Sequence, residues 1–275
     1  MNNRLKPATV AAVAALSLFA GLAFHASAGG VFLTGHDPDF HSTLGGNTAG
    51  SRRINNVAIS YVMDPAFNSF VAAGATKFLF VESSISPPSG HTVGLNGIVA
   101  SGYTQGVHFD HADASTLNAA LNQLGTVYGG IVVASDFGGL LTQAELDILN
   151  ARAADIATFV NNDGGLYAMA EGNSGAGLTP NGGWFAFVPQ VTASSVLNQP
   201  ETGNITTLFG QSLGLTDADV NGNASHNIFT TVQSLQAVNL DQSGRILSVA
   251  GRVNIPAPAS LALLGIAALA GRRRR

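Results

Sequence analysis

The sequence predicts an α/β fold, in which a three-layer, mostly parallel sheet is flanked by helices and followed by a looser, β-containing C-terminal part. Two observations carry this prediction. Short apolar runs alternate with segments whose apolar residues recur at helical spacing, which is the pattern of βαβ units. One run, residues 130–134, is apolar almost throughout, which is typical of a strand buried on both faces of a parallel sheet.

The elements follow in order along the chain. Apolar runs predict strands at residues 31–34, 77–81, 107–109, 130–134, 166–170 and 184–188. Helical spacing predicts helices at residues 54–62, from 64 onward, at 115–124 and at 142–160. Thr142 and Glu145 form a capping box that opens the last of these helices. A terminal hairpin is expected around residues 241–244.

The N-terminal residues 1–28 are predicted to be a signal peptide. Arg4 and Lys6 give a basic start, residues 8–24 are apolar, and Ala-Ser-Ala at 26–28 is a small-residue cleavage site for signal peptidase. The remaining chain, residues 29–253, is long enough for a single α/β domain with its own core.

The C-terminal residues 254–275 are predicted to be a sorting tail. Pro256 and Pro258, with Ala257 between them, favour an extended spacer. The apolar run 261–270 can satisfy its backbone in lipid only as a helix. Such a helix covers about 15 Å of a hydrocarbon core of roughly 30 Å. The four terminal arginines favour the cytoplasmic side, so the body is expected outside the inner membrane, anchored only transiently.

The order of Pro-x-Pro, short apolar helix and terminal arginine cluster resembles the PEP-CTERM sorting signal of Gram-negative bacteria. The resemblance implies recognition by exosortase, a membrane protease, and delivery to the cell surface or the extracellular matrix. The family usually carries Pro-Glu-Pro, whereas Ala257 stands at the acidic position here.

The charge of the body limits its partners. Six of the twelve basic residues lie in the two end segments, while all sixteen acidic residues lie in the body, so six basic and sixteen acidic residues give it a formal charge of −10. An acidic body argues against nucleic acid and is compatible with a cation such as calcium. The chain has no cysteine, which excludes disulfides, thiolate metal sites and a cysteine nucleophile.

Three segments of the body resemble the flavodoxin-like sheet of the class I glutamine amidotransferase-like superfamily, including its trehalose-utilisation branch. They are residues 31–36, 131–136 and 164–170, within a resemblance that covers about residues 30–190. That family places a cysteine just after the strand that corresponds to 166–170. Ala170-Glu171-Gly172 stands there in this sequence, so glutaminase chemistry is excluded.

Polar residues collect where the predicted strands end. Because ligands of open parallel sheets bind outside the carboxyl ends of the strands, a strand-end pocket is expected there. Its candidates are His36, Asp37, Asp39 and His41, Glu82 and Ser83, Asp110, His111 and Asp113, Asp136, and Glu171. Histidine and carboxylate groups suit a divalent metal or an acid–base pair. The simpler interpretation is that Asp residues cap helices and turns.

Residues 217–223 resemble the first half of an EF-hand or dockerin-type calcium loop. Oxygen side chains alternate at Asp217, Asp219, Asn221 and Asn223, and a glycine permits the tight turn. The twelfth position, normally a bidentate Glu, is Ile228. A turn rich in Asx side chains is an equally good interpretation.

Two serines are candidate nucleophiles. Ser212 lies in a Gly-x-Ser-x-Gly pattern after a β-prone segment, the signature of a nucleophile elbow, and Ser174 follows the predicted strand 166–170. His226 is the candidate base for either serine. Glycine occupies 33 of 275 positions, so an accidental match is the competing explanation.

These observations favour an exported, surface- or matrix-associated protein whose body binds a ligand such as calcium or a glycan, for example exopolysaccharide, without catalysis. The alternative is an extracellular hydrolase that uses a serine or a metal at the strand ends.

Overall fold

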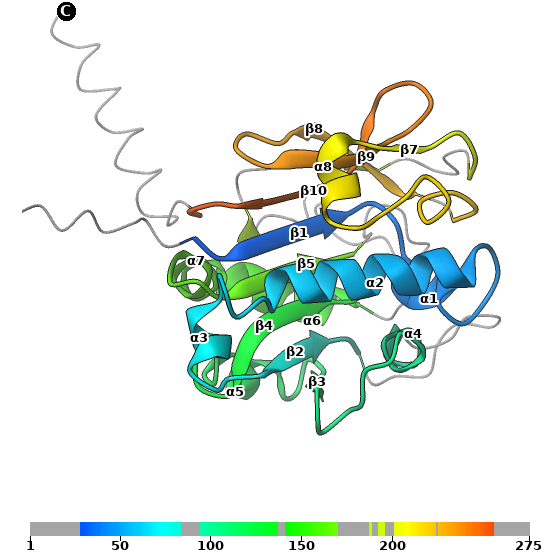
Figure 1. The fold of residues 1–275 in the computed structure, drawn as a ribbon. Coiled ribbons are helices and arrows are strands. Elements are labelled where there is room, and N and C mark those ends of the chain that lie inside the picture. Colours follow the sequence, from blue (N-terminus) through cyan, green and yellow to red (C-terminus); the bar gives the residue numbers. More distant parts are fainter. Residues whose placement is uncertain are drawn as a thin grey trace, which may run out of the picture.

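The computed structural model describes residues 28–83, 94–136, 141–169, 187–188, 192–195, 201–223 and 225–255. Over these ranges the predicted α/β class is confirmed, with helices on both sides of one ten-stranded mixed sheet (Figure 1). The predicted signal peptide up to residue 27 and the sorting tail from residue 256, with Pro256, Ala257 and Pro258, lie outside the described residues.

Five strands form the parallel part of the sheet. They are β1 (Gly30–Thr34), β2 (Lys77–Val81), β3 (Phe109–Ala112), β4 (Tyr128–Val133) and β5 (Gly165–Ala168), and they lie in the order β3-β2-β4-β5-β1. All six residues of β4 are buried, as the apolar run predicts for a strand covered on both faces.

The strand order is a shifted version of the flavodoxin-like order 2-1-3-4-5. If β2 is counted as the first strand, β3, β2, β4 and β5 follow that order, and β1 occupies the place of the fifth strand. The first strand of the chain therefore lies at the border of the parallel part, where its free edge can pair with the C-terminal strands.

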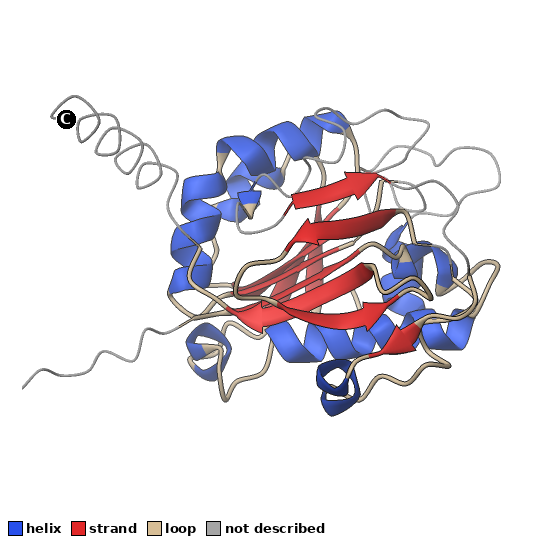
Figure 2. Cartoon of the chain, turned by 90° about the horizontal axis from the view of Figure 1, so that it is seen from above, coloured by secondary structure: helices blue, strands red, loops and turns tan. Residues whose placement is uncertain are grey.

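The helices divide between the two faces of the sheet (Figures 1 and 2). One face carries α2 (Thr48–Val62) and α4 (Gly94–Ala100), together with α1 (Pro38–His41). The other carries α5 (Leu117–Leu121), α6 (Gln143–Ala151) and α7 (Ala153–Asn161). Two short helices complete the set, α3 (Ser69–Ala72) and α8 (Leu208–Ser212).

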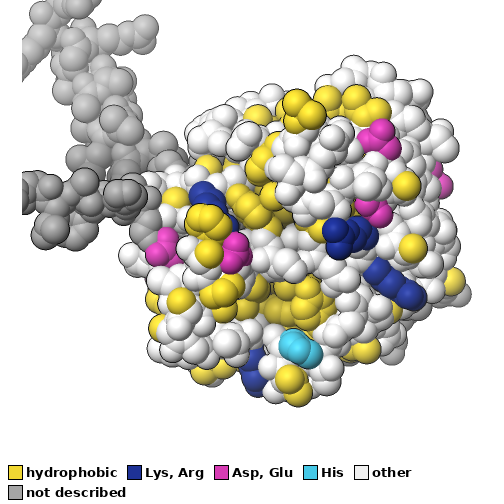
Figure 3. All heavy atoms as spheres, viewed as in Figure 1, with side chains coloured by type: hydrophobic (Ala, Val, Ile, Leu, Met, Phe, Trp, Pro, Cys, Tyr) yellow, Lys and Arg dark blue, Asp and Glu magenta, His cyan; other side chains and the backbone are white. Residues whose placement is uncertain are grey.

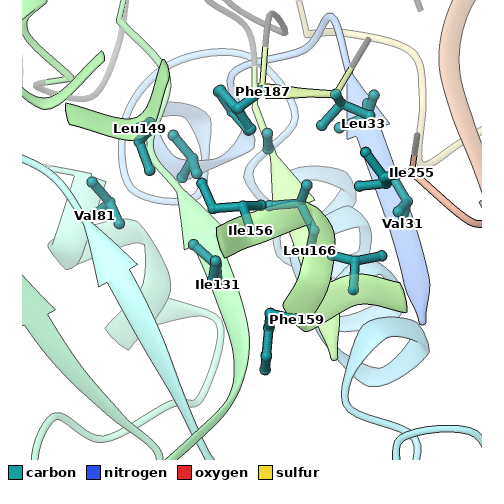
Figure 4. Close-up of a cluster of buried hydrophobic side chains, with 14 of the residues drawn as sticks. Val31, Leu33, Val81, Ile131, Leu149, Ile156, Phe159, Leu166, Phe187 and Ile255 are labelled. Atoms are coloured by element: carbon teal, nitrogen blue, oxygen red, sulfur yellow. The ribbon is translucent and has the colours of Figure 1, made fainter. Parts of the chain in front are cut away.

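Alternate residues of each strand supply the two cores. Val31, Ile131 and Leu166 point toward α7, where they meet Ile156 and Phe159 (Figure 4). Their strand neighbours on the opposite face, which include Phe32, Val132 and Tyr167, pack against α2. This period of two on both faces is what fixes the register of the parallel strands.

The C-terminal part is antiparallel and continues the same sheet. Strand β10 (Ile246–Arg252) pairs with β1, with β8 (Asn227–Thr231) and with β9 (Gln236–Leu240). Strands β6 (Thr192–Ser195) and β7 (Ile205–Thr206) join β8 and β9. The predicted hairpin is confirmed, because β9 and β10 flank a turn in which Asp241 Oδ1 accepts hydrogen bonds from the backbone N–H groups of Ser243 and Arg245.

Four local predictions were wrong. The helix expected from residue 64 onward begins only at Ser69, because residues 65–67 form a turn in which the Phe67 N–H bonds the Asp64 carbonyl. The third strand begins at Phe109, and residues 107–108 belong to a turn in which His108 N–H bonds the Thr104 carbonyl. The capping box at Thr142 and Glu145 is present, but the helix it opens ends at Ala151 and a second begins at Ala153. The described residues 187–188 are not in a strand.

Within the described parts of the chain, no helix combines the length and the apolar character needed to cross a membrane.

Candidate functional site

The segment after β1 lies against the chain that enters β8. The His226 N–H donates to the Gly35 carbonyl at 2.6 Å, and His36 forms an isolated antiparallel bridge with Ser225. A Cβ on Gly35 would lie 2.2 Å from the carbonyl oxygen of Asn227, so only glycine permits this approach. The contact brings together two polar segments that lie about 190 positions apart in sequence.

Asp37 lies between two imidazoles. Its Oδ1 is 3.4 Å from Nε2 of His41, and its Oδ2 is 3.4 Å from Nε2 of His226. Asp37 has no exposed surface. The ring of His41 is oriented by its Nδ1, which lies 3.2 Å from the Leu44 carbonyl and must donate, because a carbonyl only accepts.

The environment of His226 favours its charged form. Burial alone would lower the pKa of His226, but the nearby carboxylate of Asp37, with further contributions from Asp136 and Glu201, raises it above its ordinary value. The buried carboxylate therefore faces at least one imidazole that is readily protonated.

Asp39 joins the end of β1 to the end of β4. Its carboxylate accepts hydrogen bonds from the backbone N–H and the hydroxyl of Ser135, at 2.9 and 2.7 Å, and from the N–H of Phe40. Complete burial raises the pKa of Asp39 to about 6, although these hydrogen bonds oppose the shift.

A buried amide holds α1 in place above the sheet. Asn55 Nδ2 donates to the Pro38 carbonyl and to the Ser42 hydroxyl, each at 3.1 Å, while its Oδ1 accepts from the Tyr167 hydroxyl at 2.9 Å. Gly97 of α4 packs directly on α1, since a Cβ there would lie 1.7 Å from the Asp39 carbonyl oxygen. This packing positions Asp37 and Asp39 at the strand ends.

The other predicted pocket residues fall into separate groups. His36 Nε2 bonds the Asn239 amide at 3.0 Å and is buried. Glu82 accepts a hydrogen bond from the Leu95 N–H at 3.1 Å, and His111 Nε2 lies 3.7 Å from it. Burial lowers the pKa of His111, against the charges around it.

Asp110 does not lie at the strand ends. It is the second residue of β3, where its carboxylate pairs with Lys77 at 3.1 Å and accepts from the Tyr128 hydroxyl at 3.3 Å. Burial, with this carboxylate beside it, raises the pKa of Tyr128 to about 12. Glu171 and Ser174 lie outside the described residues.

Two of the predicted strand-end residues, Asp37 and His41, lie together, and His226, the candidate base for the serines, contacts Asp37 from its other side. Asp136 is near enough to affect the pKa of His226. Asp37 and His226 are closed to solvent, since His226 is only 2% exposed, whereas the side chain of His41 is 12% exposed. Among the described residues, no set of three or more His, Asp or Glu side chains is arranged to hold a metal ion.

In the predicted calcium loop, side-chain oxygens accept hydrogen bonds from the protein. Asp217 Oδ1 accepts from Thr206 N–H and hydroxyl, and Asp219 Oδ2 accepts from Thr216. The Oδ1 atoms of the two asparagines, Asn221 and Asn223, accept from the N–H groups of Asn204 and Asn47, respectively. This is the arrangement of an Asx-rich turn, and calcium binding stays a prediction.

Ser212 does not lie on a strand-to-helix elbow. It is the last residue of α8, and its hydroxyl donates to the Phe209 carbonyl of the same helix at 2.7 Å. It does line a groove of about 340 Å³ between α2 and α8, on the face shown in Figure 3. The groove is lined by Arg53, Asn56, Val57, Ser60, Tyr61, Asp64, Ser212 and Leu213. No histidine is among these residues.

Sequence reasoning missed the groove and the partner of His226. The groove has a sequence signal, because residues 53, 56, 57, 60, 61 and 64 recur at helical spacing and include both polar and apolar types. The contact between Asp37 and His226 has no sequence signal, because it depends on how β8 and β10 are placed beside β1. No known protein family, curated protein or solved structure matches this chain significantly.

Proposed function

We propose that this chain is an exported, cell-surface or matrix-associated protein whose body binds a ligand without catalysing its conversion. Export rests on the two end segments, the basic-apolar start and the PEP-CTERM-like tail, with signal peptidase and an exosortase-type protease as processing partners. The tail would hold the chain at the inner membrane until it is cut, and exopolysaccharide is the proposed partner outside the cell.

One observation favours binding over catalysis: the accessible groove and the acid–base groups lie in different places. Ser212 lines the groove, but its hydroxyl bonds its own helix, and none of the described histidines lines the same cavity. Asp37 and His226 lie in ion-pair contact, but both are buried. A hydrolytic site needs nucleophile, base and substrate in reach of one another.

Cell fractionation tests the export. In a Gram-negative host that carries an exosortase, an antibody to the body is expected to detect a membrane-bound precursor and a shorter extracellular form. An intact precursor dissolved in the cytosol, with neither terminus trimmed, would refute it.

The second candidate is an extracellular hydrolase, and the Asp37–His226 pair is the observation that favours it, because a carboxylate that orients a buried imidazole is a common acid–base arrangement. Turnover of ester and glycoside substrates, with and without a chelator, would be compared among the wild type, Ser212→Ala, Ser174→Ala, His111→Ala and His226→Gln. Loss of turnover in one folded variant would favour the enzyme, and the absence of turnover in the wild type would leave the binding protein.

A further inference from the structure

The groove between α2 and α8 is formed on one side by a single stripe of α2. Arg53, Val57 and Tyr61 recur every fourth residue, so they lie above one another on the same face of the helix. At about 1.5 Å per residue, the stretch from Arg53 to Tyr61 is about 12 Å long. Ser212 and Leu213 form the opposite wall. The helix stretch that lines the groove is therefore longer than one sugar ring.

The six basic residues of the acidic body differ in whether they have a carboxylate partner. Three of the six form ion pairs, namely Lys77 with Asp110, Arg152 with Asp155, and Arg245 with Asp241. The other three are Arg52, Arg53 and Arg252, and none has a carboxylate partner within 4 Å among the described residues. Arg52 and Arg53 lie on α2, and Arg252 packs on Tyr61, which also lines the groove.

Arg53 is oriented without being neutralised. Its Nε and Nη2 donate to the Gly214 carbonyl at 3.1 and 2.8 Å, which fixes the guanidinium beside the groove but supplies no negative charge. Within the described part of the chain, no other hydrogen bond or ion pair engages its remaining N–H donors, and an oriented guanidinium suits a planar carboxylate.

The opposite end of the groove, at Tyr61 and Asp64, presents an aromatic ring and a carboxylate. Tyr61 is covered by the guanidinium of Arg252, which lies 5.0 Å from the Tyr61 ring centroid and 3.7 Å from that of Phe67. Asp64 lines the groove beside Tyr61 and offers an acceptor for hydroxyl groups. Between the two ends, Asn56 and Ser212 provide an amide and a hydroxyl.

We propose that this groove binds a hydroxylated carboxylate of the uronic acid type, with the carboxylate on Arg53 and the hydroxyls along Asn56 and Asp64. The proposal rests on the proposed binding function and names its site and ligand class. Such a ligand has two sources, a free sugar acid or a segment of an acidic polysaccharide, and the length of the groove favours the segment.

Titration calorimetry on the full chain in mild detergent tests this proposal. The probes are galacturonate, trigalacturonate and neutral maltotriose, in 150 mM salt to screen the net negative charge of the body and with EDTA to separate uronate binding from calcium. Trigalacturonate is expected to bind, more tightly than galacturonate, and maltotriose at least tenfold more weakly. Equal affinity for galacturonate and trigalacturonate would point to the free acid as ligand and still support the site.

Arg53→Gln is expected to weaken trigalacturonate binding at least tenfold, and Arg53→Lys less, because lysine keeps the charge but not the fork. Arg152→Gln, which removes an ion-paired arginine elsewhere, is the control and should bind like the wild type. If Arg53→Gln does not fold, the comparison of Arg53→Lys with the wild type decides. Unchanged affinity in both Arg53 variants, or equal binding of maltotriose, would overturn the proposal.

Retention on the extracellular matrix of the producing cells separates this proposal from the proposed function. If the Arg53→Gln chain stays on the matrix like the wild type, the groove assignment fails while the binding function stands. If the wild-type chain neither stays on the matrix nor binds trigalacturonate, both fail.

Discussion

Replacing Asp39 by asparagine should remove a large part of the pH dependence of folding. The pKa of Asp39 rises from its ordinary value of 3.8 to about 6 in the folded protein. Between these two values the folded chain binds more protons than the unfolded chain, so the free energy of unfolding falls as pH rises. About two pKa units at roughly 1.4 kcal/mol each amount to about 3 kcal/mol, present below about pH 4 and lost by about pH 7.

Asparagine cannot ionise, so the unfolding free energy of Asp39→Asn should not show this fall between pH 4 and pH 7. At pH 4 the variant should be less stable than the wild type by about 1 kcal/mol, because an amide nitrogen in the place of Oδ2 cannot accept the hydrogen bond that the Ser135 backbone N–H donates there. At pH 7.5 the order should reverse. Urea unfolding at half-unit pH steps measures both, and Asp147→Asn, at an exposed position, is the matched control.

The difference in unfolding free energy between wild type and Asp39→Asn isolates this carboxyl from the other titrating groups. A difference that stays constant within about 0.5 kcal/mol from pH 4 to 7.5 would refute the reasoning. It would mean that the three hydrogen bonds to the carboxylate offset its burial fully.

Four further outcomes are expected. Gly97→Ala should lower the unfolding free energy by about 1–3 kcal/mol, measured by urea unfolding, because its Cβ would overlap the Asp39 carbonyl. His226→Gln should lower the unfolding free energy by about 3 kcal/mol in the same assay below about pH 6.5, and by less at higher pH. The reason is that the stabilisation by the Asp37 pair is lost as pH rises through the raised pKa of His226. An equal loss at pH 5 and 9 would contradict this. Calcium should raise the melting temperature of the wild type but not of Asp217→Ala, and no shift in the wild type would end the calcium prediction. Ala257→Glu, which restores Pro-Glu-Pro, should increase the fraction of trimmed chain on immunoblots from an exosortase-bearing host, and an unchanged fraction would count against the tail assignment.

The sequence predicts the parallel half of the fold well because its signals are local. The apolar run at residues 77–81 gives the bounds of β2 directly, and the capping box at Thr142 gives the start of α6. The break between α6 and α7 at Arg152 could not be predicted in this way. The Arg152 side chain bonds Asn118 of α5 and Asn122, the residue that follows α5. Such a contact between helices has no periodic signature in the sequence.

The candidate site shows the same division. Asp37 and His41 could be predicted as a group because they follow one strand, and Asp136 because it follows another. Asp110 was misplaced because β3 begins two residues later than the pattern suggests, which moves its carboxylate from the strand end into the strand beside Lys77. The contact between Asp37 and His226, the residue just before β8, depends on antiparallel pairing across the whole body, which no short-range pattern encodes.

Both ends of the described body are held at α7. The Gly29 N–H donates to the Val160 carbonyl at 2.8 Å, and Asn161 exchanges two hydrogen bonds with the backbone of Ile255, at 2.6 and 2.7 Å. Ile255 is buried against Val31 and Leu33 in the core (Figure 4). The last residue before the Pro-x-Pro segment is therefore fixed by contacts within the body. Because these contacts end at Ile255, before the Pro-x-Pro segment, an anchored precursor and a product trimmed beyond Ile255 would present the same groove between α2 and α8, and binding would not depend on processing.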